Sequence, residues 1–368
     1  MGQSMNPRCC ESREDPPRVS VIILNWNGWR DTEDCLRSLA GIYYRNYDII
    51  VVDNGSTDES KQELTKFMQD MARASNAQDE GTLPVSFFEL SSGDTTSKMP
   101  DIRGPGQKMV LIKSGENYGF AKGNNIGIEF ALRNFSSDYV LLLNSDTIVE
   151  ADFLGELVKV GVGDDTVGSI QSLLLKPGGM AVDSLGHEPK VFGTEDIGIK
   201  SAYTEGLLPG DVEIFGPCAA AALYRSEALK RVGLLDEGFF LIYEDVDLSW
   251  RLRLGGFKSV LAPRSVVYHK RGISAGRTSS EEMALLRKYH NNKNWLMLAV
   301  RYYPLRYILP LPSKYLRLIG RCMIYSAKLG RTGEISSLFL SSFGQRMANR
   351  KNPLLKVAQD RWIKDTRA

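Results

Sequence analysis

Short runs of aliphatic and β-branched residues that end in polar turns most constrain the fold of this chain. Val19–Leu24 is such a run, and 48–52 and 139–143 repeat it. Runs that are apolar at almost every position fit strands buried on both faces of a sheet. Between them, apolar residues recur at helical spacing, as at 31–39 and 121–134. Strands that alternate with helices predict an α/β fold with a mainly parallel sheet flanked by helices.

The chain divides by composition into three parts. Residues 1–17 are polar and contain prolines, so we expect a disordered leader. Residues 18–275 carry the alternating pattern, which a Ser-, Gly- and Asp-rich insertion at about 74–107 interrupts with at most one short strand. Stretches rich in Arg, Lys, Tyr and Leu over 280–368 predict a helical C-terminal region.

The second half of 18–275 shows weaker patterns. The glycine-rich segment 176–210 is typical of mobile loops. The remaining runs predict strands at 167–175, 215–224 and 259–262, and helices at 226–232 and 244–254.

Composition narrows the function and the compartment. Lys and Arg number 46 against 44 Asp and Glu, a net charge of +2 that gives no argument for nucleic-acid binding. The five cysteines lack zinc-site or redox spacing apart from the adjacent pair Cys9 and Cys10, which favours a reduced, cytoplasmic protein. We expect no membrane-spanning helix, because no stretch of eighteen residues is uninterruptedly apolar. The mixture of Trp, Tyr, Leu, Arg and Pro at 295–318 fits a helix at a bilayer surface as well as a helical cap on the α/β region.

Polar side chains follow two of the predicted strands at the points where they end. Ligands of open parallel sheets gather at these carboxyl ends. Asp53 stands at one of them, where a lone carboxylate is equally explained as a helix cap. Asn144 and Asp146 stand at the other, two positions apart, so their side chains can point the same way. Such an oxygen pair suits Mg²⁺ or Mn²⁺.

A third acidic group opens the predicted helix 244–254. Glu244, Asp245 and Asp247 there could simply match the helix dipole. The apolar segment before them instead favours a partly desolvated surface, where a carboxylate becomes a usable general base. His269 follows a strand-like run and could be structural or a metal ligand; the two other histidines have no comparable context.

Taken together, five ordered segments between Arg18 and Ile273 carry a resemblance to a known family. They are VSVIILNWNG at 19–28, VVDNGSTD at 51–58, NYGFAKGNNIG at 117–127, LLLNSD at 141–146 and FFLIYEDVDLSWRLR at 239–253, with Tyr268-His269 closing the pattern. They resemble the inverting family 2 glycosyltransferases of GT-A fold, in the rhamnosyltransferase-like branch. The resemblance implies a Rossmann-like domain with a nucleotide-sugar donor and a bound Mg²⁺ or Mn²⁺.

The resemblance also assigns expected roles to individual residues. Asp53 would accept a hydrogen bond from the imide of uracil or thymine. Asp146 would be the main metal ligand with His269 as the second, because Asn144 replaces the first acid of the family's Asp-x-Asp motif. The residues expected to bind the nucleotide are Asn25, Asp53, Asn117, Gly119, Lys122 and Asn144.

On the acceptor side, Asp245 matches the family's catalytic base, and Glu244 and Asp247 would shape the acceptor site. The implied reaction moves a sugar from dTDP-rhamnose or a UDP-sugar to a hydroxyl of a glycan or lipid-linked acceptor in cell-surface polysaccharide or glycoconjugate synthesis. It would take place in the cytoplasm or at the inner face of the cell membrane. A nucleotidyltransferase is disfavoured because no Gly-rich, basic phosphate loop follows the first strand. The intact acids and His269 disfavour a non-catalytic nucleotide-sugar-binding homologue.

Overall fold

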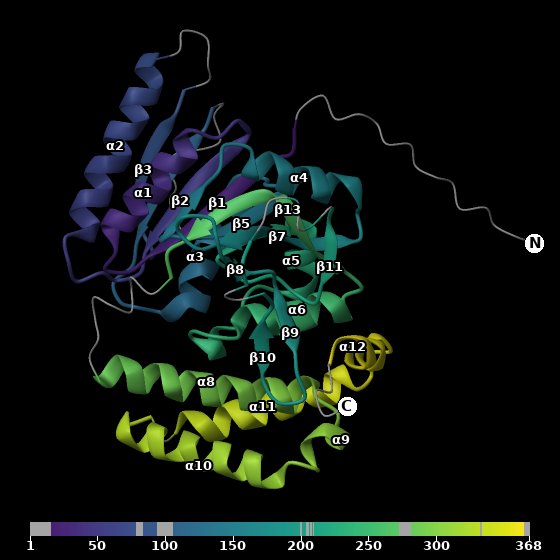
Figure 1. Ribbon diagram of the computed structural model, residues 1–368. Coiled ribbons are helices and arrows are strands. Elements are labelled where there is room, and N and C mark those ends of the chain that lie inside the picture. The colour runs from purple at the N-terminus through teal and green to yellow at the C-terminus, as the bar shows by residue number, and fades with distance from the viewer. Residues whose placement is uncertain are drawn as a thin grey trace, which may run out of the picture.

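A computed structural model describes most of the chain (Figure 1). The described residues are 16–78, 84–93, 106–198, 201–203, 206, 208, 210–271, 281–331 and 333–363. The predicted disordered leader therefore lies outside the described residues except for Pro16 and Pro17, as do two parts of the predicted insertion.

A single mixed sheet forms the centre of the described structure. Its order is β11-β13-β7-β12-β5-β1-β2-β4-β3, with β6 paired to β13 and β8 paired to β7. The strands β3, β4, β2, β1 and β5 are parallel, and β12 runs antiparallel to both of its neighbours. The strands are β1 (Val19–Asn25), β2 (Tyr47–Asp53), β3 (Ser86–Ser91), β4 (Lys108–Lys113), β5 (Tyr139–Asn144), β6 (Thr147–Val149), β7 (Val167–Leu175), β8 (Val182–Ser184), β11 (Val212–Ile214), β12 (Ala221–Arg225) and β13 (Lys258–His269).

Helices cover both faces of the sheet, which confirms the predicted α/β class. One apolar core lies under α1, α2 and α4, and a second lies under α3, α5 and α6. Each core is filled by alternate residues of the same strands, as expected for strands buried on both faces. The bounds are α1 (Trp29–Ala40), α2 (Ser60–Gln78), α3 (Gly119–Asn134), α4 (Phe153–Gly163), α5 (Ser226–Val232) and α6 (Glu244–Leu254).

The C-terminal region is helical, as predicted. Its helices are α8 (Glu281–Tyr302), α9 (Leu305–Ile308), α10 (Pro312–Lys328), α11 (Glu334–Asn349) and α12 (Leu354–Trp362). They form a layer below the sheet region in Figure 1, with α10 at its outer edge. A third apolar core joins this layer to α6, where Trp250 stacks on Tyr302 at 5.1 Å between ring centroids. Within the described residues, no helix has both the length and the apolar character needed to cross a bilayer.

The structure differs from the sequence prediction at several boundaries. The predicted strand 215–224 is shorter, because 215–220 leaves the sheet at Pro217, which lacks the N–H that a central strand needs. In place of loops alone, 176–198 contains β8 and a small hairpin of β9 (His187–Pro189) and β10 (Thr194–Asp196). Helix α2 begins at Ser60, whose N–H donates to the Asp58 carboxylate.

Candidate active site

A cavity of about 750 Å³ opens at the carboxyl ends of β1, β2 and β5. The start of α6, the β9–β10 hairpin and the start of α8 form its other walls. Its lining includes Asn54, Asn117, Asn144, Asp146, Asp245 and His269. The strand-end motifs and the acidic helix start are therefore brought to one cavity, although about a hundred residues separate Asn144 from Asp245 in sequence.

Asn25 and Asp53 lie behind the wall of this cavity rather than on it. Both side chains are buried, and the Asn25 amide donates to Asp53 Oδ1 at 2.8 Å. The other carboxylate oxygen, Oδ2, accepts the Ser56 N–H at 3.2 Å. In this conformation Asp53 is hydrogen-bonded within the protein, so a base would reach it only after a shift of the neighbouring wall.

Asn54 is the residue of this region that faces the cavity. Its amide donates to Asn117 Oδ1 at 2.9 Å and to the Gly119 carbonyl at 3.1 Å, and its Oδ1 accepts the Tyr118 N–H at 3.0 Å. Gly119 has φ +80°, and a Cβ there would lie 2.6 Å from the Phe240 carbonyl oxygen, so the position requires glycine. Sequence analysis did not assign Asn54 to the site.

Lys122 lies close to this loop but is not part of the cavity lining. Its ammonium lies 4.2 Å from the centroid of the Tyr118 ring. A different cation reaches the cavity, namely Arg287 of α8. Nothing in the pattern around Arg287 marked it, because α8 follows the last motif and its contact with the cavity depends on how the helix docks.

Asp146, Asn144 and His269 come together at one end of the cavity. His269 Nε2 lies 3.2 Å from Asp146 Oδ1 and 3.3 Å from the Asn144 amide nitrogen. Its other ring nitrogen lies 2.8 Å from Asp183, a fully buried carboxylate of β8. Burial acts to lower the pKa of His269, but its hydrogen bonds to Asp146 and Asp183 raise it to about 9.

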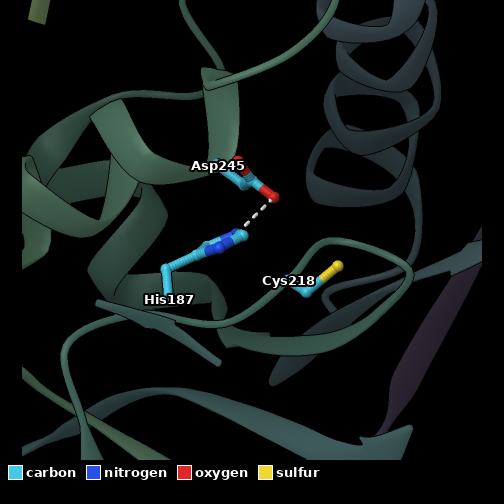
Figure 2. Close-up of side chains that lie close together, drawn as sticks. All are labelled: His187, Cys218 and Asp245. Atoms are coloured by element: carbon cyan, nitrogen blue, oxygen red, sulfur yellow. Dashed lines mark hydrogen bonds and ion pairs between the residues drawn. The ribbon is translucent and has the colours of Figure 1, made fainter. Parts of the chain in front are cut away.

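Asp245 lies at the first turn of α6 and is held by three donors. Oδ1 accepts the Val246 N–H at 2.8 Å, and Oδ2 accepts the Ala219 N–H at 3.2 Å. Oδ2 also lies 2.9 Å from His187 Nε2 (Figure 2). A carboxylate oxygen has two lone pairs, so Oδ1 keeps one lone pair beyond its bond to Val246.

The two acids next to Asp245 have different surroundings. Glu244 lines the cavity, and burial together with the Asp245 charge raises its pKa to about 8. Asp247 is absent from the lining, in contrast to its expected place on the acceptor side. Its buried carboxylate instead lies 2.8 Å from each of Arg251, Arg301 and Tyr302, which ties α6 to α8.

No sequence pattern marks His187, but in the structure it connects Asp245 to a longer series of ion pairs. Its Nδ1 lies 2.9 Å from Asp196 of β10. Arg271 then joins Asp196 at 2.7 Å to Asp183 at 2.8 Å, and Asp183 contacts His269. Burial would lower the pKa of His187, but the Asp245 and Asp196 carboxylates raise it to about 10. A charged chain therefore runs unbroken from Asp146 to Asp245.

Two groups of side chains in the cavity could in principle hold a metal. Ligand atoms of His187, Cys218 and Asp245 all lie within 4.8 Å of one another (Figure 2). Burial raises the pKa of the Cys218 thiol, which disfavours the thiolate that a metal requires. His187 contacts two carboxylates, as His269 does, so the histidines do not distinguish the two groups. Asp146 and His269 suit Mg²⁺ or Mn²⁺ better because this pair contains no thiol, and Asp183 holds the far ring nitrogen of His269 so that Nε2 points toward Asp146.

Comparison with known proteins places this geometry in context. Residues 20–80 match the family described as Glycosyl transferase family 2, and residues 91–292 match Glycosyltransferase like family 2. A low-salt glycan biosynthesis hexosyltransferase of Haloferax volcanii is 24% identical over 64% of this chain, which spans only 61% of that protein's length. An N-acetylglucosaminyl-diphospho-decaprenol L-rhamnosyltransferase of Mycobacterium tuberculosis is 22% identical, with 77% of this chain and 85% of that protein covered.

A solved structure supports the fold assignment. The structure of GalNAc-T7 with UDP, GalNAc and Mn²⁺ is 14% identical and has a TM-score of 0.56, covering 93% of this chain and 59% of that one. This similarity concerns the fold alone, which is of the GT-A type. More than half of the chain matches the second of the two family descriptions, and the five motifs meet at one cavity. The chain therefore belongs to family 2 of the glycosyltransferases.

Proposed function

We propose that this chain is an inverting, metal-dependent glycosyltransferase. Its donor would be a nucleotide diphosphate sugar, either dTDP-rhamnose or a UDP-sugar, and its acceptor a hydroxyl of a glycan or lipid-linked sugar. The observation that carries the proposal is the position of Asp245, an anchored carboxylate with a free lone pair on the wall of the cavity that also contains Asp146 and His269.

In this proposal the donor nucleotide lies against Asn54, Asn117 and Gly119 at the carboxyl ends of β1 and β2. The amide groups there offer hydrogen bonds, and Asp53 lies directly behind them for the base. Arg287 of α8 supplies a positive charge to the lining of the same cavity, suited to a diphosphate.

Asp146 and His269 would hold Mg²⁺ or Mn²⁺ at the other end of the donor. When bound, the cation would act as a Lewis acid that stabilises charge on the departing diphosphate. Asn144 orients His269 from the same side, and Asp183 fixes its ring from behind.

Asp245 would take the proton of the acceptor hydroxyl at Oδ1 as that oxygen attacks the anomeric carbon. Attack from the face opposite the diphosphate inverts the anomeric centre in one displacement. His187 acts as a positioning residue, because it contacts Oδ2 and fixes the orientation of the carboxylate. Glu244 completes the acceptor side.

The acceptor and the place of the reaction belong to the proposal as well. The name of the mycobacterial relative describes transfer to a diphospho-decaprenol, which is a lipid-linked acceptor. We place the present reaction in cell-surface polysaccharide or glycoconjugate synthesis, at the inner face of the cell membrane.

The first test measures release of nucleotide diphosphate from a panel of UDP-, dTDP- and GDP-sugars in the presence of Mn²⁺ or Mg²⁺. We expect metal-dependent release from one donor, reduced by about 10²- to 10⁴-fold in Asp245→Asn, because a general base contributes a factor of this size. His187→Gln should lower kcat by a smaller factor and leave KM for the donor unchanged. Asp165→Asn, an exposed acid away from the cavity, is the matched control.

Two results would contradict the proposal. One is full activity of Asp245→Asn with a donor that the wild type uses. The other is the absence of metal-dependent binding of every nucleotide sugar in calorimetry with a folded protein. Once a donor and an acceptor are known, the anomeric configuration of the product, measured by NMR, tests inversion directly.

A further inference from the structure

The C-terminal helices α10 and α11 present apolar side chains that no described part of the chain covers. Both helices pack on α8, and both lie beyond the residues that match the family descriptions. In Figure 1, α10 forms the outer edge of the helical layer, on the side away from the sheet. The surface of these helices therefore lies outside the part of the chain that the family descriptions match.

Helix α10 has three faces rather than two. Its buried face packs on the third core through Tyr315, Leu318, Cys322 and Ser326. A second face carries large apolar side chains that are exposed, at spacings of three, four and one: Leu316, Ile319, Met323 and Ile324. A third face is basic and consists of Lys314, Arg317, Arg321 and Lys328. At 100° per residue, the exposed apolar stripe lies between the buried face and the basic face.

Helix α11 repeats the exposed apolar stripe. Leu340, Phe343 and Met347 stand at spacings of three and four and are 76%, 58% and 48% exposed. Side chains of this size exposed in series on two helices that both pack on α8 make an apolar surface that soluble proteins rarely leave uncovered. We call the exposed apolar side chains of α10 and α11, together with the basic face of α10, the α10–α11 surface.

The charge of this region indicates what covers the α10–α11 surface. Residues 305–363 contain eleven Lys or Arg side chains and only two acidic ones, Glu334 and Asp360. Asp360 is paired with Arg306. A second copy of the chain would bring the same positive charges against this surface and would be repelled. An anionic surface with an apolar interior satisfies both the basic and the apolar faces.

We propose that the α10–α11 surface binds the interfacial region of a bilayer that contains anionic phospholipids. Helix α8 connects this surface to the active-site cavity, because Met283, Leu286 and Arg287 at its start line the cavity while α10 and α11 pack along it. Docking therefore holds the cavity close to the lipid surface. Only one part of this inference rests on the proposed function: a lipid-linked acceptor would reach Asp245 from the membrane to which the chain is bound.

The test is co-sedimentation of the full chain with vesicles of pure phosphatidylcholine or of phosphatidylcholine with 30% phosphatidylglycerol. We expect binding to the anionic vesicles, weakened at 0.5 M NaCl because salt screens the basic face. The double variant Leu316→Glu/Met323→Glu should bind at least tenfold more weakly. Tyr43→Glu/Val162→Glu is the matched control, since these side chains are similarly exposed, 73% and 59%, but lie on the sheet region.

The outcomes separate this inference from the proposed function. Donor hydrolysis measured without vesicles should be unchanged in Leu316→Glu/Met323→Glu, and its melting curve should match that of the control. The inference is overturned if the wild type does not bind anionic vesicles, or if the double variant binds them as strongly as the wild type. Either result holds whatever the transferase assay shows. The inference is also overturned if the wild type sediments as a dimer, the double variant sediments as a monomer, and neither binds vesicles. The α10–α11 surface would then serve self-association. If vesicle binding follows the expected pattern but no donor is hydrolysed, only the proposed function fails.

Discussion

The two ends of the active-site cavity are built from different kinds of side chain. At the end formed by β1, β2 and α3, neutral amides and backbone groups hold one another, with Asn54 at the centre of three hydrogen bonds. At the other end, an unbroken chain of alternating charges joins Asp146 to Asp245 through His269, Asp183, Arg271, Asp196 and His187. The first end offers hydrogen bonds to a ligand, whereas the second offers charge.

Two buried histidines, His187 and His290, show what keeps a buried side chain charged. His187 is buried between two carboxylates, which raise its pKa to about 10 against the effect of burial. His290 of α8 is also buried, but its charged neighbours are the cations Lys293 and Arg331. Burial and these cations lower its pKa to about 3. Burial alone therefore does not decide the charge of a histidine in this protein; the sign of its neighbours does.

The largest effect is expected at Asp183, which lies in the middle of the charged chain. Asp183→Asn would leave His269 and Arg271 without their shared buried carboxylate, and we expect a loss of about 3–5 kcal/mol in the free energy of unfolding. Affinity for Mn²⁺ should fall by about 10- to 100-fold, because the carboxylate behind a metal-binding histidine fixes its ring. Urea denaturation and calorimetry measure the two effects.

The matched control for this change is Asp165→Asn. Its ion pair with Arg225 involves a carboxylate that is 95% exposed, so we expect no measurable change in stability. If Asp183→Asn were as stable as this control, the charged chain would contribute nothing to the fold, and the contrast between the two ends of the cavity would disappear.

The sequence motifs contain residues of both ends of the cavity, but they do not show the contacts at both ends equally well. Asn54 and Asn117 stand in motifs at the ends of a strand and a loop, so the parallel topology alone brings them together. The partners of the charged end stand in less regular sequence: His187 meets Asp245 across 58 residues, and Asp183 meets His269 across 86. Asp183, His187 and Asp196 stand in a glycine-rich segment that shows no periodicity, so no local pattern marks them.

Asp247 shows the converse limit of sequence reasoning. The family resemblance implied a place for Asp247 on the acceptor side beside Asp245, but residues two positions apart in a helix differ by about 200° around its axis. The structure accordingly directs Asp247 away from the cavity toward Arg301 of α8. Whether an acidic residue binds a ligand or a neighbouring helix depends on the docking of α8, which the sequence around Asp247 does not encode.

A smaller effect is expected at the neutral end. Asn54→Ala would remove the acceptor for the Tyr118 N–H and the donor to Asn117, and we expect a loss of about 1–3 kcal/mol in the free energy of unfolding. Because no charge is removed, the loss should be the same at low and high salt. KM for the donor should rise more than kcat falls.

The control for Asn54→Ala is Asn134→Ala, which removes one amide hydrogen bond, to the Phe130 carbonyl at the end of α3. We expect this variant to leave KM unchanged. A salt-dependent loss in Asn54→Ala, or an equal rise of KM in both variants, would show that the amide cluster is not a separate neutral site.

An effect that appears only at acidic pH concerns His290, which stacks on Phe240 of the cavity wall at 5.0 Å between ring centroids. Its folded-state pKa of about 3 lies below the ordinary value of 6.5, so both states are neutral above pH 6.5 and His290 has no effect there. As the pH falls below 6.5, His290 binds a proton in the unfolded chain but not in the folded chain, and stability decreases by up to about 1.4 kcal/mol per pH unit.

His290→Phe keeps a stacking ring and removes this titration. We therefore expect the wild type to lose about 2 kcal/mol more than His290→Phe between pH 6.5 and pH 5 in urea denaturation. Parallel pH profiles would mean that His290 accepts a proton in the folded state despite its cationic neighbours, and the sign of the neighbours would then not explain the difference from His187.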